Sequence, residues 1–305
     1  MRVLVAGGTG FIGTTLCTEL DERGHDVTAL SRDPDKTALP AGVDVTMGDV
    51  QAYDSIVEAI EGQDVVVNLV SLSPLFEPPG GVSHEDVHLR GTENLVAAAA
   101  EGGVDRFVQM SALGADPRGP TEYLRAKGEA ERVVRSSDLA WTIFRPSVVF
   151  GDGAEFVEFT KKLTTPYLTG LPGGGKTPFQ PIWVGDLVPM LADAVEDDAH
   201  AGETYEIGGP EVLTLEDVTG LAYEAEGKSV TVLPVPMGLA RIGLAAAGPL
   251  PFVPFGPDQA RALGVDNTVD DNDVTAFGRS EDDLRTLRSY LGLEPRRGRA
   301  RTGAE

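Results

Sequence analysis

The stretch MRVLVAGGTGFIG, residues 1–13, decides the fold of this chain. A short apolar run leads into three glycines at three-residue spacing, and an amphipathic run follows as far as Arg23. Such glycines let a strand turn tightly into a helix and bring backbone N–H groups close to a pyrophosphate, which the helix N-terminus attracts. The alternative is a tight turn without a ligand. The predicted cofactor contacts in this stretch are Gly7, Gly10, Phe11, Ile12 and Gly13.

Strand and helix patterns alternate through the first half of the chain. Most of the strand patterns are continuous Val, Ile and Leu runs, which are typical of buried parallel strands. The succession predicts an α/β fold, a doubly wound parallel sheet of the NAD(P)-binding Rossmann type with right-handed crossovers. We expect strands at 2–6, 26–30, 43–47, 64–70, 104–110 and 140–145, and helices at 11–23, 52–61, 84–101 and 121–136.

After Pro146 the pattern loosens, with a short strand at 182–184 and helices near 186–197 and 214–226. We expect a smaller C-terminal substrate or cap region that completes a cleft at the carboxyl edge of the sheet. The predicted organisation is a Rossmann domain at 1–146, its core extended by later elements, then the cap region at 147–295 and a flexible tail at 296–305.

The composition limits the partners of the chain. Its 305 residues carry a formal charge of −23, a halophile-like acidic surface that repels nucleic acid and anionic lipid. A single cysteine and the lack of a signal or transmembrane pattern predict a cytoplasmic protein. The Pro/Gly/Phe-rich segment 234–257 is either a lid over the substrate or a surface for peripheral docking to a membrane complex.

The end of the second predicted strand bears on the choice of cofactor. Ser31 and Arg32 stand where NAD-binding proteins usually carry an acidic residue, and a guanidinium suits a 2′-phosphate. Asp33, before Pro34, fits a helix N-cap better than a ribose ligand. NADP(H) is therefore favoured, and NAD(H) stays open. After the third predicted strand, Asp49 and Val50 are expected to border the adenine. After the fourth, Val70 and Ser71 are expected to border the nicotinamide half.

Tyr123 and Lys127 are four residues apart, so they share one face of the helix at 121–136. On that face Lys127 is the only charge we expect, so it needs partners or a shifted pKa. A cofactor ribose and the nearby phenol would account for it. The alternative is a lysine that extends past a core tyrosine to solvent.

Together these motifs resemble the short-chain dehydrogenase/reductase superfamily, in its extended and atypical branches, over residues 1–230. The resemblance implies that Tyr123 is the general acid/base toward a carbonyl or alcohol. It implies that Lys127 binds the nicotinamide ribose and lowers the phenol pKa, and that Ser111 hydrogen-bonds the reacting oxygen. The matching elements are Gly7-Gly8-Thr9-Gly10-Phe11-Ile12-Gly13, Gly48-Asp49-Val50, Ser111 in QMSALGA, Tyr123-x-x-x-Lys127, Arg145-Pro146-Ser147 and Gln180-Pro181-Ile182-Trp183-Val184-x-Asp186.

Two features depart from the pattern of extended members. The segment between Ser111 and Tyr123 is short, and His88 stands where an asparagine is common. The segments SALGAD, residues 111–116, and YLRAK, residues 123–127, are most similar to the branch that contains the NADPH-binding accessory subunit of respiratory complex I. Members of that branch can hold NADPH for stability or assembly without evident turnover.

Two further motif matches lack the scaffold that their chemistry needs. GLPGGGKT at 170–177 satisfies the P-loop pattern, but prolines and a strand follow it instead of a helix. HEDVH at 84–88 satisfies a zinc-protease pattern, but Asn94 stands at the third ligand position, so we expect no metal. The substrate-facing candidates are His88, Arg145 and Lys176.

Three functions remain open at this point. The first is an NADP(H)-dependent oxidoreductase or epimerase-like enzyme acting on a small carbonyl or hydroxyl compound. The second is a non-catalytic, NADPH-stabilised accessory protein of a respiratory NADH dehydrogenase. The third is a redox-sensing regulator of the NmrA type, which the Tyr123–Lys127 pair argues against.

Overall fold

The strand order of the central sheet places β1 between β2 and β4. This computed structural model describes all residues except 35–38, 76–78, 237–256, 263 and 294–305. The sheet is parallel and seven-stranded, in the order β11-β6-β5-β4-β1-β2-β3, so the order reverses at β1, where ligands bind in such folds. Its strands are β1 (Arg2–Ala6), β2 (Asp26–Ser31), β3 (Asp44–Met47), β4 (Val65–Asn68), β5 (Arg106–Met110), β6 (Ala140–Pro146) and β11 (Glu203–Ile207).

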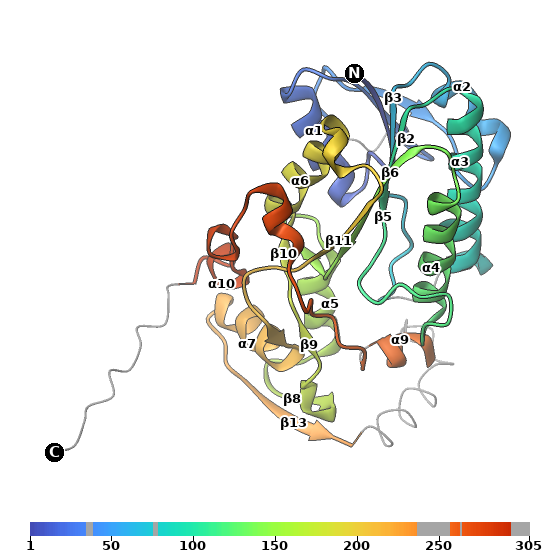
Figure 1. The fold of residues 1–305 in the computed structure, drawn as a ribbon. Coiled ribbons are helices and arrows are strands. Elements are labelled where there is room, and N and C mark those ends of the chain that lie inside the picture. Colours follow the sequence, from blue (N-terminus) through green and yellow to red (C-terminus); the bar gives the residue numbers. More distant parts are fainter. Residues whose placement is uncertain (35–38, 76–78, 237–256, 263, 294–305) are drawn as a thin grey trace.

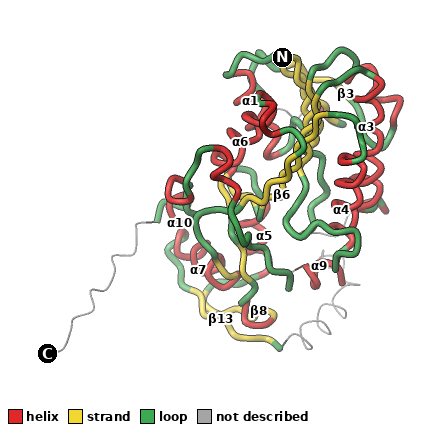
Figure 2. Tube along the Cα trace, viewed as in Figure 1, coloured by secondary structure: helices red, strands yellow, loops and turns green. Residues whose placement is uncertain are grey.

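Helices cover both faces of this sheet (Figures 1 and 2). Alternate residues of β1 explain why: Val3 and Val5 pack into one core cluster, while Leu4 and Ala6 pack into another. The first cluster holds α1 and α6, and the second holds residues of the opposite helices. The bounds are α1 (Phe11–Glu22) and α6 (Val184–Glu196) on one face, and α2 (Val57–Ile60), α3 (Gly91–Glu101) and α4 (Glu122–Arg135) on the other.

A smaller layer lies below the carboxyl edge of the sheet, in the lower part of Figure 1. Its core is a third apolar cluster that includes Phe150, Phe156 and Leu171. Short strands pair here as β7–β10, β8–β13 and β9–β12. The elements are β7 (Val149–Phe150), α5 (Glu155–Leu163), β8 (Tyr167–Pro172), β9 (Pro178–Phe179), β10 (Ile182–Trp183), β12 (Leu213–Thr214), α7 (Leu215–Ala225), β13 (Val230–Val235), α9 (Pro257–Ala262) and α10 (Leu287–Tyr290).

The predicted fold class is confirmed, and the differences are local. The helix expected at 52–61 is a 3₁₀ turn, Tyr53–Ser55, followed by α2. The helix expected at 84–101 begins as a π-helix, Glu85–Arg90, before α3. No strand was expected at 203–207, yet β11 pairs with β6, so the later half of the chain completes the sheet. Most of segment 234–257 and all of the tail at 296–305 lie outside the described residues.

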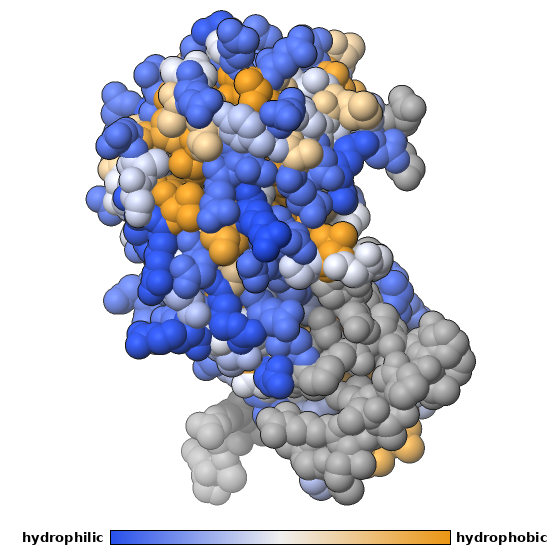
Figure 3. All heavy atoms as spheres, turned by 90° about the vertical axis from the view of Figure 1, so that its right-hand side faces the viewer, coloured by the Kyte–Doolittle hydropathy of each residue, from blue (hydrophilic) through white to orange (hydrophobic). Residues whose placement is uncertain are grey.

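The surface over α2, α3 and α4 is mostly hydrophilic, with apolar residues scattered among polar ones (Figure 3). The helices therefore turn their polar sides outward, as amphipathic helices on a sheet do. Within the described residues, no helix is long and apolar enough to cross a membrane.

Candidate cofactor and substrate site

A cavity of about 1080 Å³ opens at the carboxyl edge of the sheet. Its volume lies at the upper end of the range for small-molecule sites, roughly 300–1,000 Å³. All of the residues predicted to contact the cofactor line it, together with Ser111. They are Gly7, Gly10, Phe11, Ile12, Gly13, Ser31, Arg32, Asp49, Val50, Val70, Ser71, Tyr123 and Lys127.

The glycine turn at the end of β1 is built for close approach of backbone to backbone. Gly7 has φ +81°, which side chains disfavour, and its N–H donates to the Leu30 carbonyl. A Cβ at Gly13 would lie 2.2 Å from the Gly7 carbonyl oxygen, so only glycine fits there. No side chain caps α1 at Gly10, so its first turn presents backbone donors to the cavity. These features fit a dinucleotide pyrophosphate.

The end of β2 forms another wall of the cavity. The hydroxyls of Thr9 and Ser31 are hydrogen-bonded at 2.8 Å, and the Ser31 oxygen also accepts from the Asp33 N–H. Arg32 is exposed at this wall. Asp49, after β3, accepts at Oδ1 from the Gln51 N–H at 3.0 Å. A guanidinium and two carboxylates, those of Asp33 and Asp49, thus lie along the part of the cavity predicted for the adenosine half.

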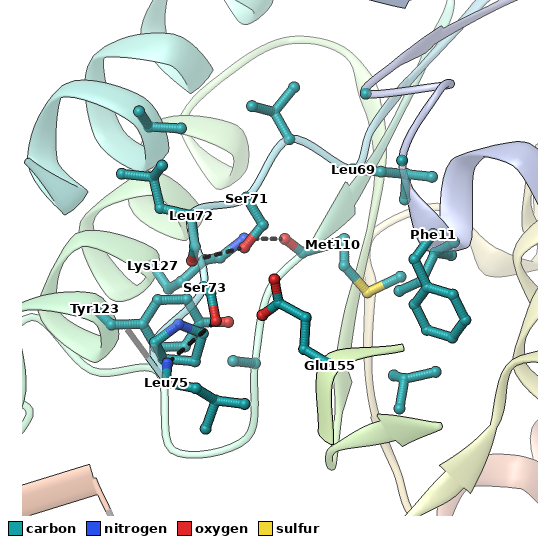
Figure 4. Close-up of a pocket in the computed structure, with 18 of the residues that line it drawn as sticks. Phe11, Leu69, Ser71, Leu72, Ser73, Leu75, Met110, Tyr123, Lys127 and Glu155 are labelled. Atoms are coloured by element: carbon teal, nitrogen blue, oxygen red, sulfur yellow. Dashed lines mark hydrogen bonds between the residues drawn. The ribbon is translucent and has the colours of Figure 1, made fainter. Parts of the chain in front are cut away.

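Tyr123 and Lys127 enter the cavity from the first turns of α4, which Thr121 caps by accepting from the Leu124 N–H. Lys127 Nζ donates to the Met110 carbonyl at 2.8 Å and lies 5.9 Å from the centroid of the Tyr123 ring (Figure 4). Burial lowers the Lys127 pKa to about 7, although the Glu131 carboxylate opposes this shift.

The phenol of Tyr123 differs from what the resemblance implies. Burial raises the pKa of Tyr123 to about 12, and the hydroxyl of Ser71 is the group that acts in the opposite direction. Lys127 lies over the ring, and its amine is engaged by Met110. The structure therefore holds Tyr123 as a neutral phenol, a proton donor, instead of the lowered pKa implied by the resemblance.

Ser111 lies at the end of β5, and its hydroxyl is engaged by a carboxylate. It donates to Glu131 Oε1 at 2.6 Å, and Glu131 is only 1% exposed. The expectation that Lys127 is the only charge on the inward face of α4 is wrong, because Glu131 lies one helical turn beyond it on that face. The spacing of four residues was the signal that could have found Glu131. A contact of Ser111 with a reacting oxygen stays a prediction.

The comparisons with known proteins agree with this geometry. A family described as NAD(P)H-binding matches residues 7–167, more than half of the chain. The chain belongs to this NAD(P)H-binding family. It is 31% identical over 290 residues to the mitochondrial NADH dehydrogenase [ubiquinone] 1 alpha subcomplex subunit 9 of Arabidopsis thaliana, covering 88% of this chain and 71% of that protein.

A curated relative and a solved structure that are similar to this chain are both enzymes. A 3-diazoavenalumate denitrifying reductase of Streptomyces is 34% identical over 227 residues, covering 65% of this chain and 73% of that protein. The crystal structure of a Thermus thermophilus UDP-glucose 4-epimerase with NAD has a TM-score of 0.66 and 25% identity, covering 77% of this chain and 86% of that chain. The predicted membership of the extended short-chain dehydrogenase/reductase superfamily is confirmed.

This family member carries two histidines behind Tyr123. His84 and His88 are stacked, with ring centroids 5.6 Å apart, and both meet the Tyr123 ring edge-on at 5.5 and 5.2 Å. His88 is buried and does not line the cavity, so the expected substrate contact is corrected. His88 lies in the π-helical segment Glu85–Arg90, and its ring packs against Tyr123. Burial, Lys127 and His84 hold the pKa of His88 well below its usual value.

The other two substrate-facing candidates are directed elsewhere. Arg145 donates to Glu131 and Glu206, and Lys176 pairs with Glu216 on the surface; neither lines the cavity. The glycines at 173–175 form a 3₁₀ turn between β8 and β9 with no helix after them, unlike a P-loop. In the described parts of the chain, no three His, Cys, Asp or Glu residues are grouped to hold a metal ion.

Proposed function

We propose that this protein is an NADP(H)-dependent oxidoreductase that acts on a carbonyl or hydroxyl compound. The observation that carries the proposal is the meeting of Tyr123 and Lys127 with the glycine turn of β1 in one cavity. A phenol beside a buried amine at the reactive end of the cavity is the arrangement that proton transfer to a carbonyl requires.

When bound, the nicotinamide would supply or accept the hydride. The protein's part is placement and proton transfer. Tyr123 is a neutral phenol near pH 7, as an ordinary tyrosine is, and burial raises its pKa further, so it holds the proton that a carbonyl oxygen needs on reduction. Lys127, whose pKa is lowered to about 7, can exchange a proton near neutral pH, and its contact with Met110 fixes the amine beside the ring.

The preference for NADP(H) over NAD(H) is part of the proposal. It rests on Ser31 and Arg32, which line the cavity at the end of β2. A guanidinium recognises a phosphate through paired, charge-assisted hydrogen bonds, and Ser31 supplies a hydroxyl beside it.

The experiment compares binding and turnover in the wild type and in Tyr123→Phe. Calorimetry with NADPH and NADH measures affinity, and loss of NADPH absorbance with a panel of carbonyl compounds measures turnover. We expect Tyr123→Phe to lower turnover by about 100-fold or more, because that is the usual contribution of a general acid, and to change NADPH affinity by less than about threefold. Full turnover in Tyr123→Phe would refute the proposal.

A second candidate is a non-catalytic accessory protein that holds NADPH at the periphery of a membrane complex. Its support is the similarity to the Arabidopsis NADH dehydrogenase subunit across most of the chain. Cofactor binding and carbonyl turnover, measured on the same purified protein, distinguish the accessory role from the oxidoreductase function. NADPH that copurifies with the protein, tight rebinding and no turnover of any carbonyl compound would favour the accessory role.

A further inference from the structure

Much of the cavity lining contributed by the smaller layer is apolar. Six of the lining side chains are apolar and come from the strand ends and the smaller layer: Leu113, Phe156, Phe159, Phe179, Leu215 and Val265. Phe156 and Phe179 pack against each other with centroids 5.7 Å apart. Such walls bind hydrocarbon. Ser147 and Asn267 also line the cavity, but the Ser147 hydroxyl already donates to Asn267 Oδ1 at 2.7 Å.

The charges on the described lining are unevenly distributed. The only cations are Arg32, at the end of β2, and Lys127, whose amine is held by Met110. The two carboxylates near α5 and α9 are Glu155 and Asp258, and Asp258 is engaged by the Glu122 N–H and by Arg261. Glu155, at the start of α5, points its carboxylate into the cavity (Figure 4).

From these walls and this charge we propose, building on the oxidoreductase function above, that the substrate is a largely apolar carbonyl compound without negative charge. Its hydrogen-bond donor or cationic group meets Glu155. A carboxylate facing an apolar cavity repels an anionic substrate and accepts a hydrogen bond from a hydroxyl or amine. A sugar nucleotide is disfavoured because its diphosphate finds no arginine or lysine on the described walls that the smaller layer contributes.

The test uses two biphenyl ketones that differ in one group. They are 4-acetyl-4′-(hydroxymethyl)biphenyl, which is neutral, and 4′-acetylbiphenyl-4-carboxylate, with UDP-glucose as a third probe. Calorimetry measures the affinity of the full-length protein for each in saturating NADP⁺, which cannot reduce a ketone, and NADPH oxidation is followed separately. We expect the neutral ketone to bind about tenfold more tightly than the carboxylate, because like charges repel at close range even though solvent reaches the exposed Glu155 side chain and weakens the repulsion.

Glu155→Gln should bring the two affinities to within about threefold of each other, since only the charge is removed. The matched control is Glu158→Gln on the same helix; Glu158 pairs with Lys161 and does not line the cavity, so the ratio should stay as in the wild type. Equal affinities in the wild type, a ratio unmoved by Glu155→Gln, tighter binding of UDP-glucose, or no binding of either ketone would each overturn the inference. Selective binding without NADPH oxidation would support the inference and contradict the oxidoreductase function.

Discussion

The Ser111 hydroxyl donates a 2.6 Å hydrogen bond to the buried Glu131 carboxylate. The same carboxylate accepts from Arg145 at 2.8 and 2.7 Å and pairs with Arg135 at 3.0 Å. One buried charge thus joins the end of β5 to α4 and β6. Because it also favours the protonated form of Lys127, this carboxylate connects the stability of the fold to the site.

We expect Glu131→Gln to lower the free energy of unfolding by about 2 kcal/mol or more, because Arg145 loses the partner that compensates its burial. Urea unfolding monitored by circular dichroism measures the change. The control is Glu129→Gln, whose exposed pair with Arg132 should contribute less than about 0.5 kcal/mol. Equal small changes in both variants would show that the buried carboxylate does not hold these elements together.

Gly13 should be required for cofactor binding by steric necessity. A Cβ there would meet the Gly7 carbonyl oxygen at 2.2 Å, so Gly13→Ala must displace the turn between β1 and α1. We expect affinity for NADPH to fall by about tenfold or more and the free energy of unfolding to fall by about 1–3 kcal/mol. The helical control is Gly220→Ala in α7, where an added Cβ meets nothing within 4 Å. It should stabilise the protein slightly, by about 0.5–1 kcal/mol, and leave calorimetric affinity unchanged.

Arg32 is the residue on which the proposed NADP(H) preference depends. We expect Arg32→Ala to weaken NADPH binding by about tenfold or more, since a hydrogen bond to a charged group contributes about 1.5–3 kcal/mol, and to change NADH binding less than about twofold. Arg118→Ala removes the same charge from an exposed position that does not line the cavity, and neither affinity should change. Parallel weakening of both dinucleotides by Arg32→Ala would assign Arg32 to a general electrostatic role instead.

The sequence predicts the sheet and the cofactor wall well because both depend on local rules. Buried parallel strands have continuous apolar sequences, and the glycine turn needs its glycines at fixed spacing. β11 escapes this rule because it lies at an edge of the sheet, where buried and partly exposed residues alternate through ETYEI.

The directions of the polar side chains were harder to predict, because contacts far apart in sequence decide them. Arg145 meets Glu206 across the neighbouring strand, and Ser111 turns toward α4. His88 packs between His84 and Tyr123 instead of lining the cavity. The spacing of the motifs locates Arg145 and Ser111 but contains no information on which residues they contact.

The lowered pKa of Lys127 gives the fold a specific pH dependence. The pKa of the amine is about 7 in the folded protein and 10.5, the ordinary value for lysine, when the chain unfolds. Between these values the unfolded chain binds more protons, so the free energy of unfolding should rise with pH, by at most about 1.4 kcal/mol per pH unit. Cys17 acts in the opposite direction from about pH 8 upward, because its thiol begins to ionise there in the unfolded chain, while burial raises the pKa of the folded thiol to about 12. The window from about pH 7 to 8 therefore isolates Lys127.

Urea unfolding at several pH values in this window, for the wild type and Lys127→Met, measures the effect. We expect the rise with pH to be lost in Lys127→Met, because a thioether fills similar space and binds no proton. Tyr123→Phe is the control, since the phenol titrates above the window in both states and its removal should leave the slope unchanged. An identical slope in Lys127→Met would mean that the amine is charged throughout, and Lys127 could then not exchange a proton near neutral pH as the proposed mechanism requires.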